Sequence, residues 1–163
     1  DYRLKQIKSL SHTYIYPLNA KTNKSIDDIF HKLTANSKTT EYEFKIMGHK
    51  LRAKKVASAV ALFDFEDLCV QPLGSMDYAF IAEKFNTIFL TNVPKLSKED
   101  RNEARRFITL IDELYERKTR LIISADCKPE EIYPQGDGSF AFARTVSRLH
   151  EMQSTRYLDN KTA

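Results

Sequence analysis

The chain has 163 residues, of which 42% are hydrophobic and 29% charged, so it can bury the core of one domain or slightly more. No apolar run approaches the roughly 18 residues that a membrane-spanning helix needs, and no secretory signal is visible. The net charge is +4, but residues 1–60 hold 12 Lys/Arg against 5 Asp/Glu. Such a basic third suits an acidic partner or is simply a solvated face.

The first part of the chain predicts a mixed segment. Residues 12–16 are β-prone, and Ser25 is a plausible cap for a helix with an apolar stripe ending at Leu33. Residues 42–46 and 50–56 flank Met47-Gly48-His49, which predicts a hairpin, and residues 59–65 have the length of a strand. We therefore expect a basic α/β segment over 1–58 and a second α/β domain over 59–163.

The second part alternates helices and short apolar strands. A helix starts at Ser75, a strand covers 87–93, a helix is capped by Ser97, a strand covers 120–125, and a helix runs from Ser139. This alternation predicts an α/β fold with a mostly parallel sheet flanked by helices. In such a sheet, ligands bind at the carboxyl ends of the strands, where Asp64, Asn92 and Asp126 lie.

The chain carries no phosphate-binding or dinucleotide-binding glycine motif, and it has only 4 glycines. Asp126 suits the sensing of a phosphate or a bound water, or else the capping of the turn before Pro129. Asn92 is the second candidate for cofactor binding. No metal site is expected, because Cys69 and Cys127 lie far apart and the 4 histidines are scattered. Two buried thiols favour a reducing compartment, namely the cytosol or an organelle matrix.

Charged residues on the helices offer further candidates. Arg144 and Arg148 stand one helical turn apart, and their guanidinium groups suit phosphate recognition or simple pairing with Glu151. Arg105-Arg106 is a similar pair. Asp112-Glu113 follows two aliphatic residues, as a metal-positioning pair of carboxylates at the end of a strand would. The apolar stripe of the helix after Ser97 instead puts both residues on a polar face, where Glu113 would pair with Arg117.

Several strings resemble the carboxyl-terminal half of the ZapE family of ATPases, which includes bacterial cell-division ATPases and mitochondrial lactation-elevated ATPases. The first string runs from Asp77-Tyr78 to Val93-Pro94. The others are Ala104-Arg105-Arg106-Phe107-Ile108, Ser124-Ala125 and Arg144-Thr145-x-Ser147-Arg148-Leu149-x-Glu151-Met152-Gln153-Ser154. The resemblance implies AAA+-type hydrolysis of ATP with Mg²⁺ in the complete protein, a homo-oligomeric ring and a protein client. In bacteria the client would belong to the division ring, and in mitochondria to the respiratory chain.

In the family, the phosphate loop, the acidic strand and the first sensor precede the region that this chain resembles. We therefore expect this part alone neither to bind nor to hydrolyse ATP. From residue 87 onward the chain resembles the second half of an AAA+ core in which Thr91-Asn92 replaces the acidic pair, which makes it a degenerate module. The alternative is a generic α/β lid with the same order of elements. By the same resemblance, Arg148 or Arg144 is a candidate sensor or trans-acting arginine, and Arg148 is preferred. A stand-alone nucleic-acid-binding module, using Lys50, Arg52, Lys54 and Lys55, is the alternative.

Overall fold

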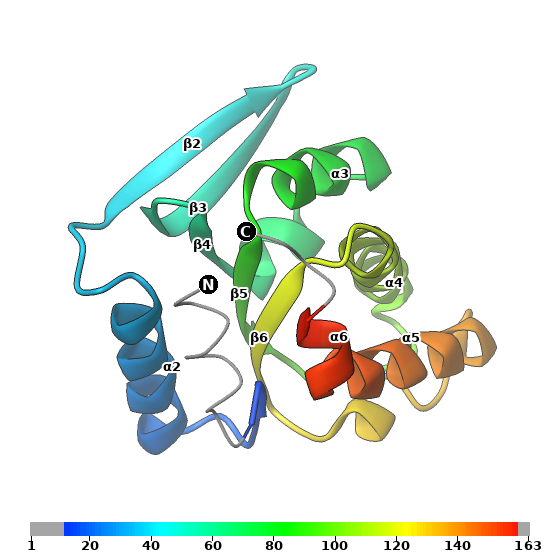
Figure 1. The fold of residues 1–163 in the computed structure, drawn as a ribbon. Helices are drawn as coiled ribbons and strands as arrows, with labels where there is room; N and C mark the ends of the chain where they lie inside the picture. Colours follow the sequence, from blue (N-terminus) through cyan, green and yellow to red (C-terminus); the bar gives the residue numbers. More distant parts are fainter. Residues whose placement is uncertain (1–11, 160–163) are drawn as a thin grey trace.

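A six-stranded mixed sheet forms the centre of the computed structural model, which describes residues 12–159 (Figure 1). The strand order is β1-β6-β5-β4-β3-β2, with β4, β5, β6 and β1 parallel and β3 and β2 antiparallel. The strands are β1 (Tyr14–Ile15), β2 (Thr40–Ile46), β3 (His49–Ala57), β4 (Val60–Asp64), β5 (Thr87–Val93) and β6 (Arg120–Ala125). The α/β class and the hairpin expected from the sequence are confirmed.

Helices cover both faces of the sheet. In the described part of the chain, α2 (Ala20–Leu33) lies on one face (Figure 1). The opposite face is covered by α3 (Ser75–Lys84), α4 (Arg101–Glu116), α5 (Ser139–Glu151) and α6 (Thr155–Asp159). Two short turns follow β4 and β6, η1 (Glu66–Val70) and η2 (Pro129–Glu131). No helix in the described part of the chain is long and apolar enough to cross a membrane.

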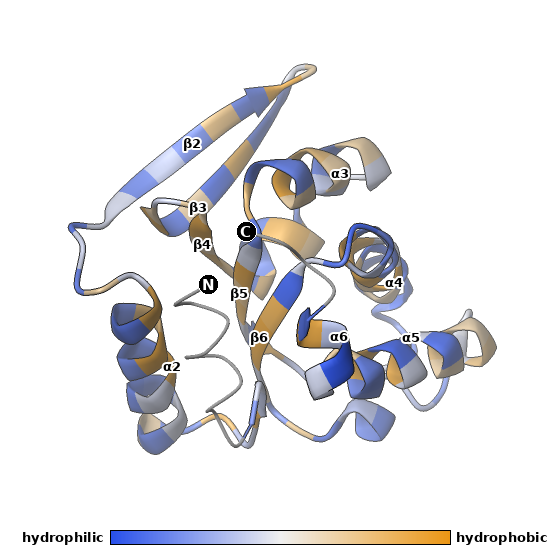
Figure 2. Ribbon diagram, viewed as in Figure 1, coloured by the Kyte–Doolittle hydropathy of each residue, from blue (hydrophilic) through white to orange (hydrophobic). Residues whose placement is uncertain are grey.

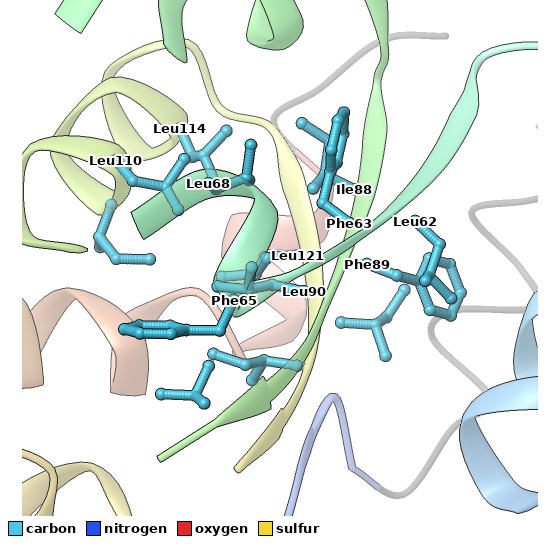
Figure 3. Close-up of a cluster of buried hydrophobic side chains, with 14 of the residues drawn as sticks. Leu62, Phe63, Phe65, Leu68, Ile88, Phe89, Leu90, Leu110, Leu114 and Leu121 are labelled. Atoms are coloured by element: carbon cyan, nitrogen blue, oxygen red, sulfur yellow. The ribbon is translucent and has the colours of Figure 1, made fainter. Parts of the chain in front are cut away.

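The core lies between the parallel strands and the helices. All residues of β6 are buried, as expected of a strand covered on both faces, whereas β2 and β3 alternate apolar and polar residues (Figure 2). Leu62 and Phe89 lie toward α2, where Phe89 packs edge-on against Phe30 at 5.1 Å between ring centroids. Leu110 and Leu114 of α4 pack on the opposite face (Figure 3).

Two helices begin at residues other than the expected ones. The cap of α2 is Asn19, whose side-chain oxygen accepts from the Thr22 amide at 2.9 Å, so Ser25 lies inside the helix. The apolar stripe starts only at Ile26 because the first turns of α2 are polar. The other helix, α4, has its cap at Asp100, whose carboxylate accepts from the amide of Ser97 at 2.8 Å. Ser97 therefore precedes the helix instead of capping it.

The expected division at residue 58 falls in the turn that joins β3 to β4. These strands pair antiparallel, with Val56 opposite Ala61 and Ala57 opposite Val60. Both proposed parts therefore contribute strands to one sheet, and the division into a segment and a domain stays a prediction.

Candidate functional site

Polar side chains from three strands meet at the carboxyl edge of the sheet. Asp64 ends β4, and its Oδ1 accepts from Asn92 Nδ2 at 2.5 Å and from Thr91 Oγ1 at 3.3 Å. The backbone of Asn92 is left-handed, with φ of 63°, and its amide donates to Ser124 Oγ at 3.0 Å. This conformation accompanies the register shift between β5 and β6 that spans Leu90 to Val93.

The candidate Asn92 is therefore bonded to two neighbouring strands. Its side-chain amide is directed to Asp64, and its backbone amide to Ser124. Asp64 and Asn92 were both predicted from the sequence as strand-end residues, but the hydrogen bond between them was not. The only available sequence signal was that both residues follow apolar strands, so parallel pairing brings them to the same edge.

Asp126, the other strand-end candidate, does not join this cluster. Its backbone amide donates to the carbonyl of Val93 at 2.8 Å and extends the contact between β5 and β6. Its side chain is exposed, and no donor within residues 12–159 forms a hydrogen bond with its carboxylate. The capping of the turn before Pro129 is thus not seen, and a role in sensing phosphate or water stays a prediction.

A cavity of about 680 Å³ opens beside the ends of β4 and β5. Its polar lining consists of four carboxylates, one amide and one ammonium group, from Asp64, Glu66, Asp100, Glu103, Asn92 and Lys95. Its apolar lining includes Val70, which is 47% exposed. The excess of carboxylates opposes a polyphosphate, because like charges repel at short range. These residues do not fit the phosphates of ATP.

A second position, between β1 and β6, is where an α/β sheet of this topology usually binds its ligand. The chain leaves β1 toward α2 and leaves β6 toward α5, on opposite faces of the sheet (Figure 1). The Tyr14 hydroxyl donates to the carbonyl of Cys127 at 2.6 Å and links β1 to the segment that follows β6, and burial raises the pKa of this phenol. The short connection from β1 to α2 contains no glycine, and Asn19 already caps the helix. This position lacks the glycine-rich backbone cradle that a phosphate loop supplies.

The two candidate arginines lie away from the strand ends, where α5 contacts α4. Both form ion pairs with Asp112, Arg144 at 3.2 Å and Arg148 at shorter range. Arg148 also lies 3.7 Å from Glu116 and has its guanidinium 4.6 Å from the centroid of the Tyr115 ring. The side chain of Arg148 is only 19% exposed, whereas that of Arg144 is 60% exposed.

The expected pairing with Glu151 is not what the structure shows. Glu151 accepts a hydrogen bond from the Tyr115 hydroxyl at 2.7 Å. Both arginines form ion pairs with Asp112 of the facing helix instead. The pairing of Glu113 with Arg117 is confirmed, at 3.5 Å. Asp112 therefore joins two helices, and both Asp112 and Glu113 lie within α4, as the apolar stripe predicted, and not on a metal-positioning strand.

Of the basic residues named for the nucleic-acid alternative, all except Lys50 form an ion pair with a described acidic residue. Lys54 lies 3.5 Å from Asp67, Lys55 lies 3.3 Å from Asp27, and Arg52 pairs with Glu41. Burial raises the pKa of the Asp67 carboxyl, although the Asp64 amide and Lys54 act in the opposite direction. With most of the positive charge compensated locally, the structure gives the nucleic-acid alternative no support.

Cysteine and histidine side chains do not gather into a metal site. Within residues 12–159, no group of three or more Cys, His, Asp or Glu is arranged to hold a metal ion. His49 pairs with the buried Asp77 at 3.0 Å, and His150 lies 2.7 Å from Glu130. Both cysteines are buried and free, and burial raises the pKa of Cys69 well above its usual range. Burial therefore disfavours the thiolate of Cys69, which is the reactive form of the side chain.

Comparison with known proteins gives a match to one family model and to several longer relatives. The family model described as AFG1-like ATPase matches residues 1–161. Cell division protein ZapE of Escherichia coli K12 is 36% identical over 159 residues, which are 97% of this chain and 42% of that protein. Lactation elevated protein 1 homolog B of Danio rerio is 29% identical over 191 residues, with 96% of this chain and 38% of that protein covered. The chain thus spans about two fifths of the length of these relatives, and no solved structure matches it.

Proposed function

Because the chain belongs to the AFG1-like ATPase family, we propose that it is the carboxyl-terminal, non-catalytic region of a larger AAA+-type ATPase. The observation that carries this proposal is the family match over residues 1–161 of a chain without a phosphate-binding glycine loop. Relatives more than twice as long have room for that loop in the part that this chain does not cover. ATP and Mg²⁺ would be held there.

The geometry of the strand ends supports the proposal that nucleotide binding belongs to another region of the complete protein. Asn92 stands where an acidic metal-binding residue would end the strand, and its amide is bonded to Asp64. The connection between β1 and α2 contains no glycine. Both features suit a module that keeps an ATPase-like sheet as a scaffold and leaves the chemistry to another region.

We propose that the complete protein couples ATP hydrolysis to the remodelling of a protein partner. One relative is named for cell division, which fits a client in the bacterial division machinery, and the similarity to a lactation elevated protein homolog leaves a mitochondrial client as the alternative. The corresponding compartments are the cytoplasm and the mitochondrial matrix. Self-assembly into a ring would supply contacts between subunits.

Arg144 suits such a contact better than Arg148. The guanidinium group of Arg148 is enclosed by Asp112, Glu116 and the Tyr115 ring, whereas Arg144 is mostly exposed. An arginine that reaches the ATP of a neighbouring subunit must be accessible, and it can raise the rate by about 10³–10⁵-fold. We therefore assign the trans role to Arg144 and a positioning role to Arg148, which holds α5 against α4.

The test uses the full-length protein with Arg144→Ala or Arg148→Ala, and Arg101→Ala as a matched exposed arginine. Arg144→Ala is expected to leave the melting temperature unchanged and to lower ATP turnover by tenfold or more. Arg148→Ala is expected to lower both, because it also breaks a partly buried ion pair. Arg101, which is 3.7 Å from Asp137, should behave as the parent. Turnover within about twofold of the parent in both α5 variants would reject the assignment.

A further inference from the structure

A second cavity, of about 340 Å³, lies between the start of α3 and the first turns of α4. It shares no lining residue with the strand-end cavity. Its polar lining comes from Ser75 on α3 and from Asn102, Arg105, Arg106 and Thr109 on α4. No carboxylate lines it, in contrast to the four at the strand ends, so the two cavities have opposite charge.

One arginine of this cavity is held in place by the backbone. Arg106 Nη1 donates to the carbonyl of Cys69 at 3.1 Å and to that of Val70 at 3.5 Å, at the end of η1. Its nearest carboxylate is that of Glu103, at 4.0 Å. Two neutral carbonyls therefore orient the guanidinium without cancelling its charge.

The other arginine has no acidic partner in the described part of the chain. Within residues 12–159, no carboxylate lies within 4.0 Å of the Arg105 guanidinium, whereas Arg101, Arg144 and Arg148 of the same helix pair all have one. Ser75 and Asn102 also form no side-chain hydrogen bond with any described residue. The cavity thus combines two guanidinium groups with a free hydroxyl and a free amide.

We propose that this cavity binds a phosphoryl group, either as free phosphate or as the terminal phosphate of a small ester. Guanidinium groups match phosphate oxygens in shape and charge, and hydrogen bonds between ionised partners are about twice as strong as neutral ones. The volume admits a phosphate and a small substituent. Binding at this cavity is independent of the proposed ATPase region, because it requires neither turnover nor Mg²⁺.

The experiment is calorimetric titration of the chain with inorganic phosphate, with sodium chloride of equal ionic strength as the reference. Arg105→Ala is the main variant, since the exposed side chain has no ion pair to lose and the fold should persist. Loss of one charged hydrogen-bonding group should weaken phosphate binding about tenfold or more. Arg101→Ala, on the same helix but outside the cavity lining, should bind within about twofold of the parent.

Titration with AMP separates the sources of the phosphoryl group. Equal affinity for phosphate and AMP assigns the cavity to any terminal phosphate, and binding of phosphate without AMP assigns it to the free anion. Phosphate binding no stronger than the chloride reference would overturn the proposal, and so would unchanged binding in Arg105→Ala. ATP turnover by the full-length protein is a separate readout, so failure of this site and failure of the proposed function are distinguishable.

Discussion

The parallel half of the sheet and the β2–β3 hairpin differ in how many of their residues are buried from water. In β6 every residue is buried, and in β4 every residue except Asp64 is buried. In β2 only Phe44 is buried, and the two hairpin strands carry charged side chains along most of their length (Figure 2). The parallel half is therefore stabilised by burial on two faces, whereas the hairpin depends on a few anchoring side chains.

This difference predicts where the structure opens first. Regions with few buried contacts exchange their amides through local opening, whereas a core strand opens only when the domain unfolds. We expect the hairpin to open on its own and the parallel half to unfold as a unit. The anchors of each region offer direct ways to test this contrast.

The largest effect should come from Phe107 in the core of the parallel half. Its ring lies 6.1 Å from that of Phe65 and 5.9 Å from that of Phe142, between α4, the end of β4 and α5. Phe107→Ala should destabilise the domain by about 3–5 kcal/mol, as large-to-small changes in full burial do. Urea denaturation measures the loss. A cost below about 1 kcal/mol would show that this ring does not carry the packing of α4.

A smaller effect is expected from Phe44, the buried residue of β2. Its ring packs at 5.7 Å from Phe80 and 6.0 Å from Phe85, with Tyr42 beside it at 4.6 Å. Phe44→Ala should cost about 2 kcal/mol, because an exposed neighbourhood relaxes more easily around a cavity. Hydrogen exchange should accelerate in β2 and β3 and stay slow in β6. Equal acceleration in β6 would contradict the independence of the hairpin.

Local periodicity was sufficient to predict most of the elements. Helical spacing predicts an apolar stripe on α4 of six residues, Ala104, Phe107, Ile108, Ile111, Leu114 and Tyr115. All of them are buried except Ile108 and Tyr115, which are partly buried against the core. Helical spacing alone specifies such a face, and strands of continuous apolar character indicate a parallel sheet covered on both sides. The start of α2 was misplaced because the capping side chain of Asn19 precedes a polar first turn.

Pairings between distant residues could not be predicted in the same way. The two residues of β1 pair with β6, and Tyr14 lies opposite Ile123, a contact that no local pattern encodes. Glu151 was the nearest acidic candidate for Arg148 in sequence, but packing of α5 on α4 brings Asp112 closer. The strand-end candidates were found because sheet topology gathers them, whereas the bond between Asp64 and Asn92 depends on a local irregularity of β5.

The central claim is that this chain is a non-catalytic region of an AFG1-like ATPase, and ATP turnover by the chain alone tests it most directly. The account predicts no phosphate release from Mg–ATP above the buffer rate, and no tighter binding of Mg–ATP than of pyrophosphate. The same assay on the full-length protein should show turnover. Magnesium-dependent hydrolysis by residues 1–163 alone, abolished by Asp64→Asn, would contradict the claim and place the catalytic site at the strand ends.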